Sequence, residues 1–357
     1  MKTSPHYEQG QSSHQLYVIR TSSHTANKVT PFIDSYRLAA LEAIRGLQAG
    51  KVSTLTKALS SIDELSGWFQ PYKEITREDL YLFAGLELSF QTELFSIAFT
   101  KDYIPKVPTD DRLLKAIRET PLNLNDKQTT WTKMLNSFDI DTRKQITDKV
   151  NQAYFGGDIN GLRKAIDRTM IVRERQIKAV TRTLYQHTAS VAKQSLYRAN
   201  DDIVIGYQIV TTFDSRRSRI CTARDGEIYL YADSFNPMLP FHYNERSTDI
   251  PVLNDEFAID ESGALRAAKG ADGGQQVRVS TTGLEFAKGQ PAFWQDDLLG
   301  ADRGKIFRNA GLTPDEFQDA MRDQFDRPVT LKQMGENDAR IFEYMRKTKG
   351  LEKYTDG

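Results

Sequence analysis

The chain has 357 residues, of which 39% are hydrophobic and 10% aromatic, enough to build two or three cores of ordinary domain size. Its 48 Lys and Arg residues equal its 48 Asp and Glu residues, so attraction of the whole chain to nucleic acid or an anionic membrane is not indicated. The single cysteine, Cys221, excludes an internal disulfide framework and a four-cysteine zinc cluster.

The first 30 residues are rich in Ser, Thr, His and Gln and contain few large apolar side chains. Such a segment buries too little surface to offset the entropy of ordering. We therefore expect residues 1–30 to form a flexible polar arm.

Residues 31–199 carry apolar side chains at three- and four-residue spacing, which predicts a helical region. Proline and glycine predict breaks at Pro71, at residues 105–108, at Pro121 and at Gly156-Gly157. One apolar stripe runs from Ile177 to Ser195, and the clearest comprises Phe83, Leu86, Phe90, Leu94 and Ile97. Because Glu87, Gln91 and Glu93 interrupt the most apolar stretch, residues 80–99, we expect a core helix there and no membrane span.

Residues 200–258 have the composition of a small antiparallel β-containing core. The segment from Val204 to Phe213 is β-branched and aromatic, Asp225-Gly226 is a turn signal, and residues 227–231 alternate like a returning strand. Residues 259–280 are predicted to form an exposed Gly-rich loop. Residues 281–357 are predicted to form a short helical segment with a charged tail, and Thr313 is expected to cap one of its helices. The predicted fold class is α+β and predominantly α-helical.

A basic helix is expected between Arg163 and Arg198, where nine basic residues face two acidic ones. This surplus could contact DNA phosphates or an acidic partner, or it could be a solvated helix surface balanced by acidic segments elsewhere. The residues that we single out as contacts are Arg173, Arg175, Lys178 and Arg182.

One dense group of reactive side chains follows the predicted strand. Cys221, His242 and Glu245 offer the thiolate, imidazole and carboxylate donors that zinc accepts. The alternative is structural: Asp214 caps a turn, Cys221 is a small buried hydrophobe, and His242 and Arg246 make hydrogen bonds that hold an irregular loop. No phosphate-binding loop, dinucleotide fingerprint or hydrolase motif is present, so we expect neither an enzyme nor a bound cofactor.

The order of these elements resembles the phage head morphogenesis family, minor capsid proteins similar to protein F of phage Mu. The resemblance covers roughly residues 150–335. It includes Gly156-Gly157-Asp158 before the long helix and the tail from Gln290-Pro291 to Leu331. Its main part is a set that we call the signature residues: Asp214, Arg216, Cys221, Asp225, Gly226, Pro240, His242 and Arg246. Many members of the family have a cysteine where this chain has Glu245, so we carry the signature over as structural rather than catalytic.

The resemblance implies a minor head protein, made in the host cytoplasm and located in the virion, inside the capsid near the portal. Its implied partners are the portal protein and the major capsid or scaffold protein, with packaged double-stranded DNA as a further candidate. The implied role is association during procapsid assembly, with assistance to DNA packaging or ejection. The alternative function is a metal-dependent nuclease or a nucleotide-transferring toxin carried by a phage particle.

Overall fold

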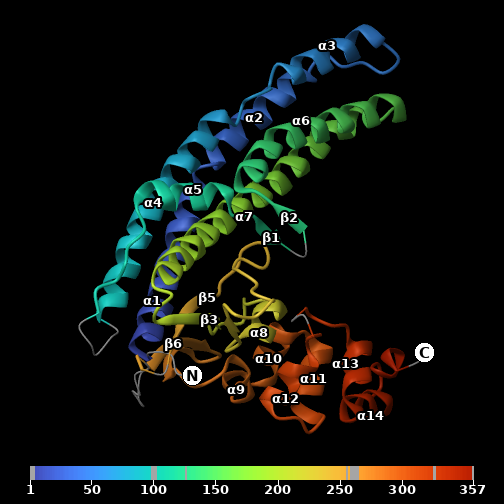
Figure 1. Ribbon diagram of the computed structural model, residues 1–357. Coiled ribbons are helices and arrows are strands. Elements are labelled where there is room, and N and C mark those ends of the chain that lie inside the picture. Colours follow the sequence, from blue (N-terminus) through green and yellow to red (C-terminus); the bar gives the residue numbers. More distant parts are fainter. Residues whose placement is uncertain are drawn as a thin grey trace.

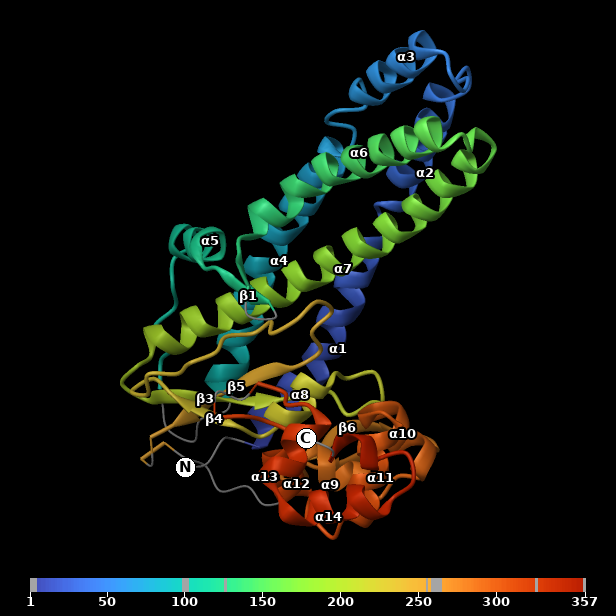
Figure 2. The same ribbon diagram turned by 90° about the vertical axis from the view of Figure 1, so that its right-hand side faces the viewer.

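A computed structural model describes residues 5–97, 103–124, 127–254, 256–257, 265–324 and 327–355. The fold is α+β and predominantly helical, with small antiparallel sheets, as the sequence predicts. Figures 1 and 2 show a long bundle of helices projecting from a compact part that contains the longer strands and the C-terminal helices. We call the helices of residues 5–199 the stalk and residues 204–355 the base module.

The stalk is organised around one helix of 41 residues, α7, which packs against α1, α2, α4, α5 and α6. The break at Gly157 is confirmed, because its φ of 77° ends α6 in the left-handed region, and Pro71 lies in the first turn of α4. The elements are α1 (Pro5–Asn27), α2 (Thr30–Ala43), α3 (Val52–Asp63), α4 (Gln70–Ile97), α5 (Asp110–Glu119), β1 (Leu122–Leu124), β2 (Lys127–Thr129), α6 (Trp131–Gly156) and α7 (Ile159–Ala199).

The expected flexible arm at residues 1–30 is wrong for residues 5–27, which form α1. Several of its polar side chains are buried and hydrogen-bonded rather than solvated. The hydroxyl of Tyr7 donates to Gln91 Oε1 at 2.9 Å, and the amide of Gln15 donates to Gln186 Oε1 at 2.8 Å. Thr25 pairs with the hydroxyl of Tyr185 at 2.9 Å. Paired polar groups can be buried without the cost that an unpaired group carries, so α1 needs few apolar residues to dock.

The core stripe predicted for α4 is wrong at one position. Phe83 and Leu94 are buried, but Leu86 is 60% exposed, and the side chain of Ile97 lies outside the described residues. The inner face carries Glu87 and Gln91 instead, and these hydrogen-bond each other and α1. The stripe from Ile177 to Ser195 on α7 does face the core.

The base module contains a three-stranded antiparallel sheet, β4 (Ile228–Leu230), β3 (Val204–Val210) and β5 (Thr248–Leu253), in the order β4-β3-β5. Tyr207 of β3 pairs with Tyr229 on one side and Pro251 on the other. The predicted strand and its returning partner are therefore confirmed. The short helix α8 (Arg219–Arg224) and Gly226, whose φ is 84°, connect β3 to β4.

The expected loop at residues 259–280 is wrong for residues 265–278, while residues 259–264 lie outside the described residues. Strands β6 (Leu265–Gly270) and β7 (Gly273–Arg278) form an antiparallel hairpin, with Gly273 at a φ of 114° in its turn. Side chains on β6 alternate between exposed and buried, and Arg266 and Ala268 face inward. Because Ala and Arg stand at these inward positions instead of large apolar residues, the hydrophobic alternation of a strand is weak in the sequence.

The C-terminal segment is helical, as predicted, and its helices pack around a core that also includes Phe213, Ala223 and Ala268. Capping boxes at Thr282, Thr313 and Thr330 begin three of the helices. Among the described helices, none carries an apolar stretch of the length that a bilayer crossing requires. The elements are α9 (Gly283–Lys288), α10 (Ala292–Leu299), α11 (Ala301–Asn309), α12 (Pro314–Ala320), α13 (Leu331–Asn337), α14 (Ala339–Lys347) and a 3-10 turn (Glu352–Tyr354).

Candidate functional site

The signature residues gather in the base module, between the end of β3 and the start of β5. Asp214 and Arg216 follow β3, and Cys221 lies on α8. Asp225 and Gly226 follow α8, and the loop between β4 and β5 supplies Pro240, His242 and Arg246. The fold therefore brings two separate segments of the sequence into one site.

Cys221, His242 and Glu245 form a compact cluster with their polar atoms directed at one another. Cys221 Sγ lies 2.8 Å from Glu245 Oε1 and 3.0 Å from His242 Nε2. His242 Nε2 lies 3.3 Å from Glu245 Oε2. The thiol and the carboxylate are buried, and the imidazole is 14% exposed. The three residues that the sequence offers as zinc ligands are thus brought together.

Backbone groups fix the orientation of this cluster. The Nδ1 of His242 donates to the carbonyl of Tyr243 at 2.8 Å, because a carbonyl oxygen can only accept. Glu245 Oε1 accepts hydrogen bonds from the backbone amide of Arg246 and from the amide and hydroxyl of Ser247, at 2.8 to 3.1 Å. Burial alone would lower the pKa of His242, but the hydrogen bond to Cys221 and the charge of Glu245 raise this pKa to about 10. Burial opposes ionisation of Glu245, yet His242 and these hydrogen bonds hold its pKa below the ordinary value.

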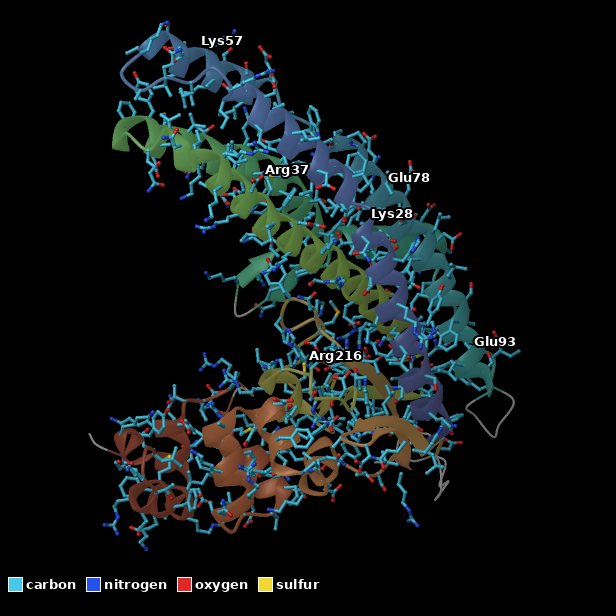
Figure 3. All side chains as sticks on the ribbon, turned by 180° about the vertical axis from the view of Figure 1, so that it is seen from behind. Lys28, Arg37, Lys57, Glu78, Glu93 and Arg216 are labelled. Carbon is cyan, nitrogen blue, oxygen red and sulfur yellow. The ribbon has the colours of Figure 1, made fainter. Side chains whose placement is uncertain are left out.

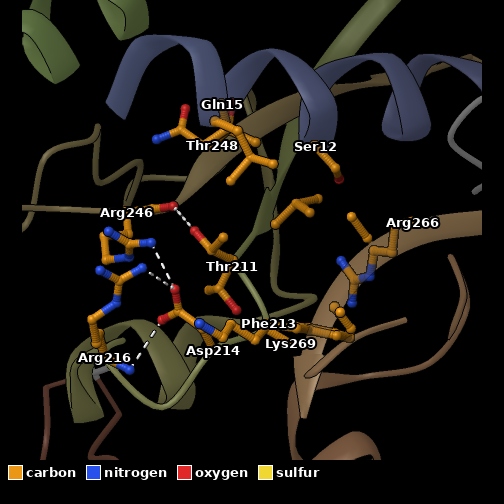
Figure 4. Close-up of a pocket in the computed structure, with 16 residues that line it drawn as sticks. Ser12, Gln15, Thr211, Phe213, Asp214, Arg216, Arg246, Thr248, Arg266 and Lys269 are labelled. Carbon is orange, nitrogen blue, oxygen red and sulfur yellow. Dashed lines mark hydrogen bonds and ion pairs between the residues drawn. The ribbon is translucent and has the colours of Figure 1, made fainter. Parts of the chain in front are cut away.

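A second cluster surrounds Asp214, at one wall of a cavity of about 250 Å³ between α1, the end of β3 and β6. Figure 4 shows Arg216 and Arg246 directed at the Asp214 carboxylate, at 3.2 Å and 2.7 Å respectively. Asp214 Oδ1 also accepts the backbone amide of Arg216, which closes a turn. Arg266 and Lys269 line another part of the cavity. The pairing of Asp214 with Arg246 holds the loop before β5 against the end of β3.

Asp225 is more than a turn residue, because its carboxylate joins three segments of the base module. It accepts the backbone amides of Thr211 and Gly283, at 2.9 Å and 2.5 Å. The guanidinium groups of Arg217 and Arg266 each lie 3.9 Å from Asp225 Oδ2. Burial lowers the pKa of Arg217, and the charge of Asp225 offsets part of that effect. The sequence analysis does not single out these two arginines. Their partners lie elsewhere in the sequence, so no local pattern indicates these contacts.

The four basic residues singled out on α7 have different environments. Arg173 is buried, so the expectation that it contacts DNA or a partner is wrong. Its guanidinium donates to Thr142 Oγ1 and to the carbonyl of Phe138, at 2.9 Å and 2.8 Å. Lys178 forms an ion pair with Glu174, at 2.7 Å.

The remaining two residues lie nearer the surface of the stalk. Arg182 is half-buried and donates to Ser23 and Asn244, whereas Arg175 is exposed. Lys164 and Arg168 are exposed as well, and their spacing from Arg175 places all three on one face of α7, within about 16 Å along the axis. We call these three residues the basic stripe. Figure 3 shows that charges of both signs surround the stalk, among them Arg37, which pairs with Asp167 of α7.

A scan of protein-family models, a search of curated proteins and a search of solved structures found no match to this chain. Its site is therefore interpreted from its residues and their geometry.

Proposed function

We propose that this chain is a phage minor head protein that works by binding, with the stalk docked on the portal or the capsid interior. The observation that carries the proposal is the convergence of the signature residues in one part of the base module. Asp214, Asp225 and Glu245 each tie together segments that are distant in sequence. This arrangement suits the structural role that the resemblance assigns to the signature.

The geometry of the Cys221 cluster favours a structural role over nucleophilic catalysis. In a nucleophile relay, the base accepts a proton from the nucleophile through one ring nitrogen, and a third group orients its other nitrogen. Here Glu245 contacts the same ring nitrogen of His242 that faces the thiol, so that nitrogen is shared with a carboxylate and is not reserved for the thiol proton. Cys221 is also fully buried, which denies a substrate access to its sulfur.

The stalk offers surfaces on which a partner could dock. Its far end, seen in Figures 1 and 2, carries Val52 at the start of α3 and Phe155 at the end of α6, which are 68% and 77% exposed. Exposed large apolar side chains at the end of a projection favour a protein partner, which would remove them from water. The basic stripe adds a positive surface for an acidic protein or for DNA.

The test is quantitative mass spectrometry of purified virions beside genome-free procapsids. We expect the chain in both particles at low copy number, and its absence from both would overturn the proposal. The charge-reversal triple variant Lys164→Glu, Arg168→Glu, Arg175→Glu should reduce incorporation. A matched control is Lys332→Glu, Lys349→Glu, Lys353→Glu, which reverses three exposed lysines of the base module and should leave incorporation unchanged.

The two particle types also separate the partners. Loss of the stripe variant from procapsids, which hold no genome, would assign the basic stripe to a protein partner. Loss from virions alone would assign it to packaged DNA. DNA cleavage with added divalent metal, abolished by His242→Ala, would instead support the nuclease alternative.

A further inference from the structure

The cluster of Cys221, His242 and Glu245 has the donor set and the arrangement of a metal site. We propose that it binds one Zn²⁺ ion, which joins α8 to the loop between β4 and β5. The proposal does not rest on the role in a phage particle, because it follows from the geometry of three side chains.

The spacing of the donor atoms suits zinc. Donor atoms of the three residues lie within 4.8 Å of one another, and the shortest separations are 2.8, 3.0 and 3.3 Å. Around a tetrahedral zinc ion, with bonds of about 2.0 to 2.3 Å, neighbouring donor atoms are roughly 3.3 to 3.8 Å apart. The sulfur must move away from the nitrogen and oxygen donors by about 0.5 to 0.7 Å to admit the ion.

The hydrogen bonds around the cluster direct its donor atoms at its centre. Because Nδ1 of His242 donates to the carbonyl of Tyr243, Nε2 faces the thiol and the carboxylate, and this nitrogen gives up its proton when it binds the metal. Metal-ligating histidines are oriented in this way, by a hydrogen bond from the nitrogen that does not bind the metal. Backbone amides and Ser247 hold the carboxylate of Glu245 in place. The donors are therefore oriented without the metal.

Charge and donor type favour zinc over other divalent ions. A thiolate and a carboxylate with one Zn²⁺ sum to zero, which suits a buried site better than two unpaired anions would. Thiolate and imidazole ligands select zinc over magnesium and calcium, which prefer oxygen. Ser218 Oγ lies 2.6 Å from His242 Nε2 and 3.1 Å from Cys221 Sγ, so it stands at the fourth position, where a water molecule is the other candidate.

The test uses the full-length chain, stripped with a chelator and dialysed against zinc sulfate or cobalt chloride. Elemental analysis should find about one zinc per chain, and the cobalt form should show a thiolate-to-metal charge-transfer band. Cys221→Ser, His242→Gln and Glu245→Gln should each weaken zinc binding by more than about 100-fold, since even outer-shell changes cost 10- to 100-fold. The matched control His14→Gln alters another histidine-glutamate pair among the described residues, His14 with Glu87 at 2.6 Å, and should leave zinc affinity unchanged.

A measurement on the wild-type chain keeps the proposal falsifiable if the variants do not fold. X-ray absorption of the zinc form should show one sulfur and two or three nitrogen or oxygen ligands, and zinc should raise the Tm of the stripped protein. A folded wild-type chain that takes up neither metal would overturn the proposal, as would zinc binding without a sulfur ligand. Loss of zinc with normal particle incorporation would leave the proposed function standing, and absence from particles with intact zinc binding would overturn that function alone.

Discussion

The fold buries the carboxylate of Glu8 between α1 and β6. Replacing Glu8 with glutamine measures the free-energy cost of burying that charge. Its carboxylate lies 3.0 Å from the guanidinium of Arg266. Burial raises the pKa of Glu8 to about 7, although Arg266 opposes this rise, and the nearby charge of Asp225 adds to it. Glu8→Gln keeps the shape of the side chain and removes its titration.

The magnitude follows from the two pKa values. Between pH 4.5, the ordinary value, and pH 7, the native state binds a proton that the unfolded state releases. The free energy of unfolding therefore falls as the pH rises through this window, and the contribution is fully present only below pH 4.5. At about 1.4 kcal/mol for each pH unit, the loss is about 3 kcal/mol.

The assay is urea unfolding of the wild-type chain and of Glu8→Gln at several pH values from 4.5 to 8, at constant ionic strength. Subtracting one profile from the other cancels the remaining titrating groups. The wild-type chain should lose about 3 kcal/mol relative to the variant across this range. Glu78→Gln, at an exposed position on α4, is the matched control and should give a profile parallel to that of the wild type.

Parallel wild-type and Glu8→Gln profiles would refute the reasoning. That result would mean that Arg266 neutralises the cost of burial and that Glu8 titrates equally in both states. A gain in wild-type stability with rising pH would show that the ion pair dominates.

Three further substitutions test the packing. Gly206→Ala places a Cβ against the backbone carbonyl of Tyr229 and should lower the free energy of unfolding by about 1 to 3 kcal/mol; unchanged urea unfolding would contradict this close approach. Arg173→Ala should lower the free energy of unfolding by about 3 kcal/mol in the same assay, whereas Arg175→Ala should change it by no more than about 0.5 kcal/mol. Equal effects would show that the two environments do not differ. Thr313→Ala removes a capping box and should lower the Tm, at a cost of about 1 kcal/mol; an unchanged Tm would mean that this cap does not stabilise the fold.

Features with a local cause could be predicted from the sequence. β3 is evident from its β-branched and aromatic residues, and the return at Asp225-Gly226 follows from the left-handed backbone that Gly226 adopts. The capping box at Thr313 could also be predicted, because it involves only four consecutive residues. Each of these signals acts within a few residues of its effect. The sequence also offers Cys221, His242 and Glu245 as one group of metal-binding donor types, and the structure brings them together.

Features that depend on distant partners could not be predicted. The polar composition of α1 indicates disorder until Gln91 and Gln186 are known to complete its hydrogen bonds. Arg173 is indistinguishable from Arg175 by residue type, and only the packing of α6 buries one of them. The free-energy cost of burying a polar group depends on whether it has a hydrogen-bonding partner. The amino-acid composition does not reveal whether such a partner is present.

The docking of α1 on the base module has a consequence for synthesis. Its partner strand β6 follows it by roughly 260 residues, so the chain must close a very long loop before Glu8 meets Arg266. At about 5 to 20 residues per second, α1 waits on the order of tens of seconds on the ribosome before β6 emerges. The contacts of α1 with the base module are therefore completed long after the helix itself is made, and its polar side chains favour solubility during that wait.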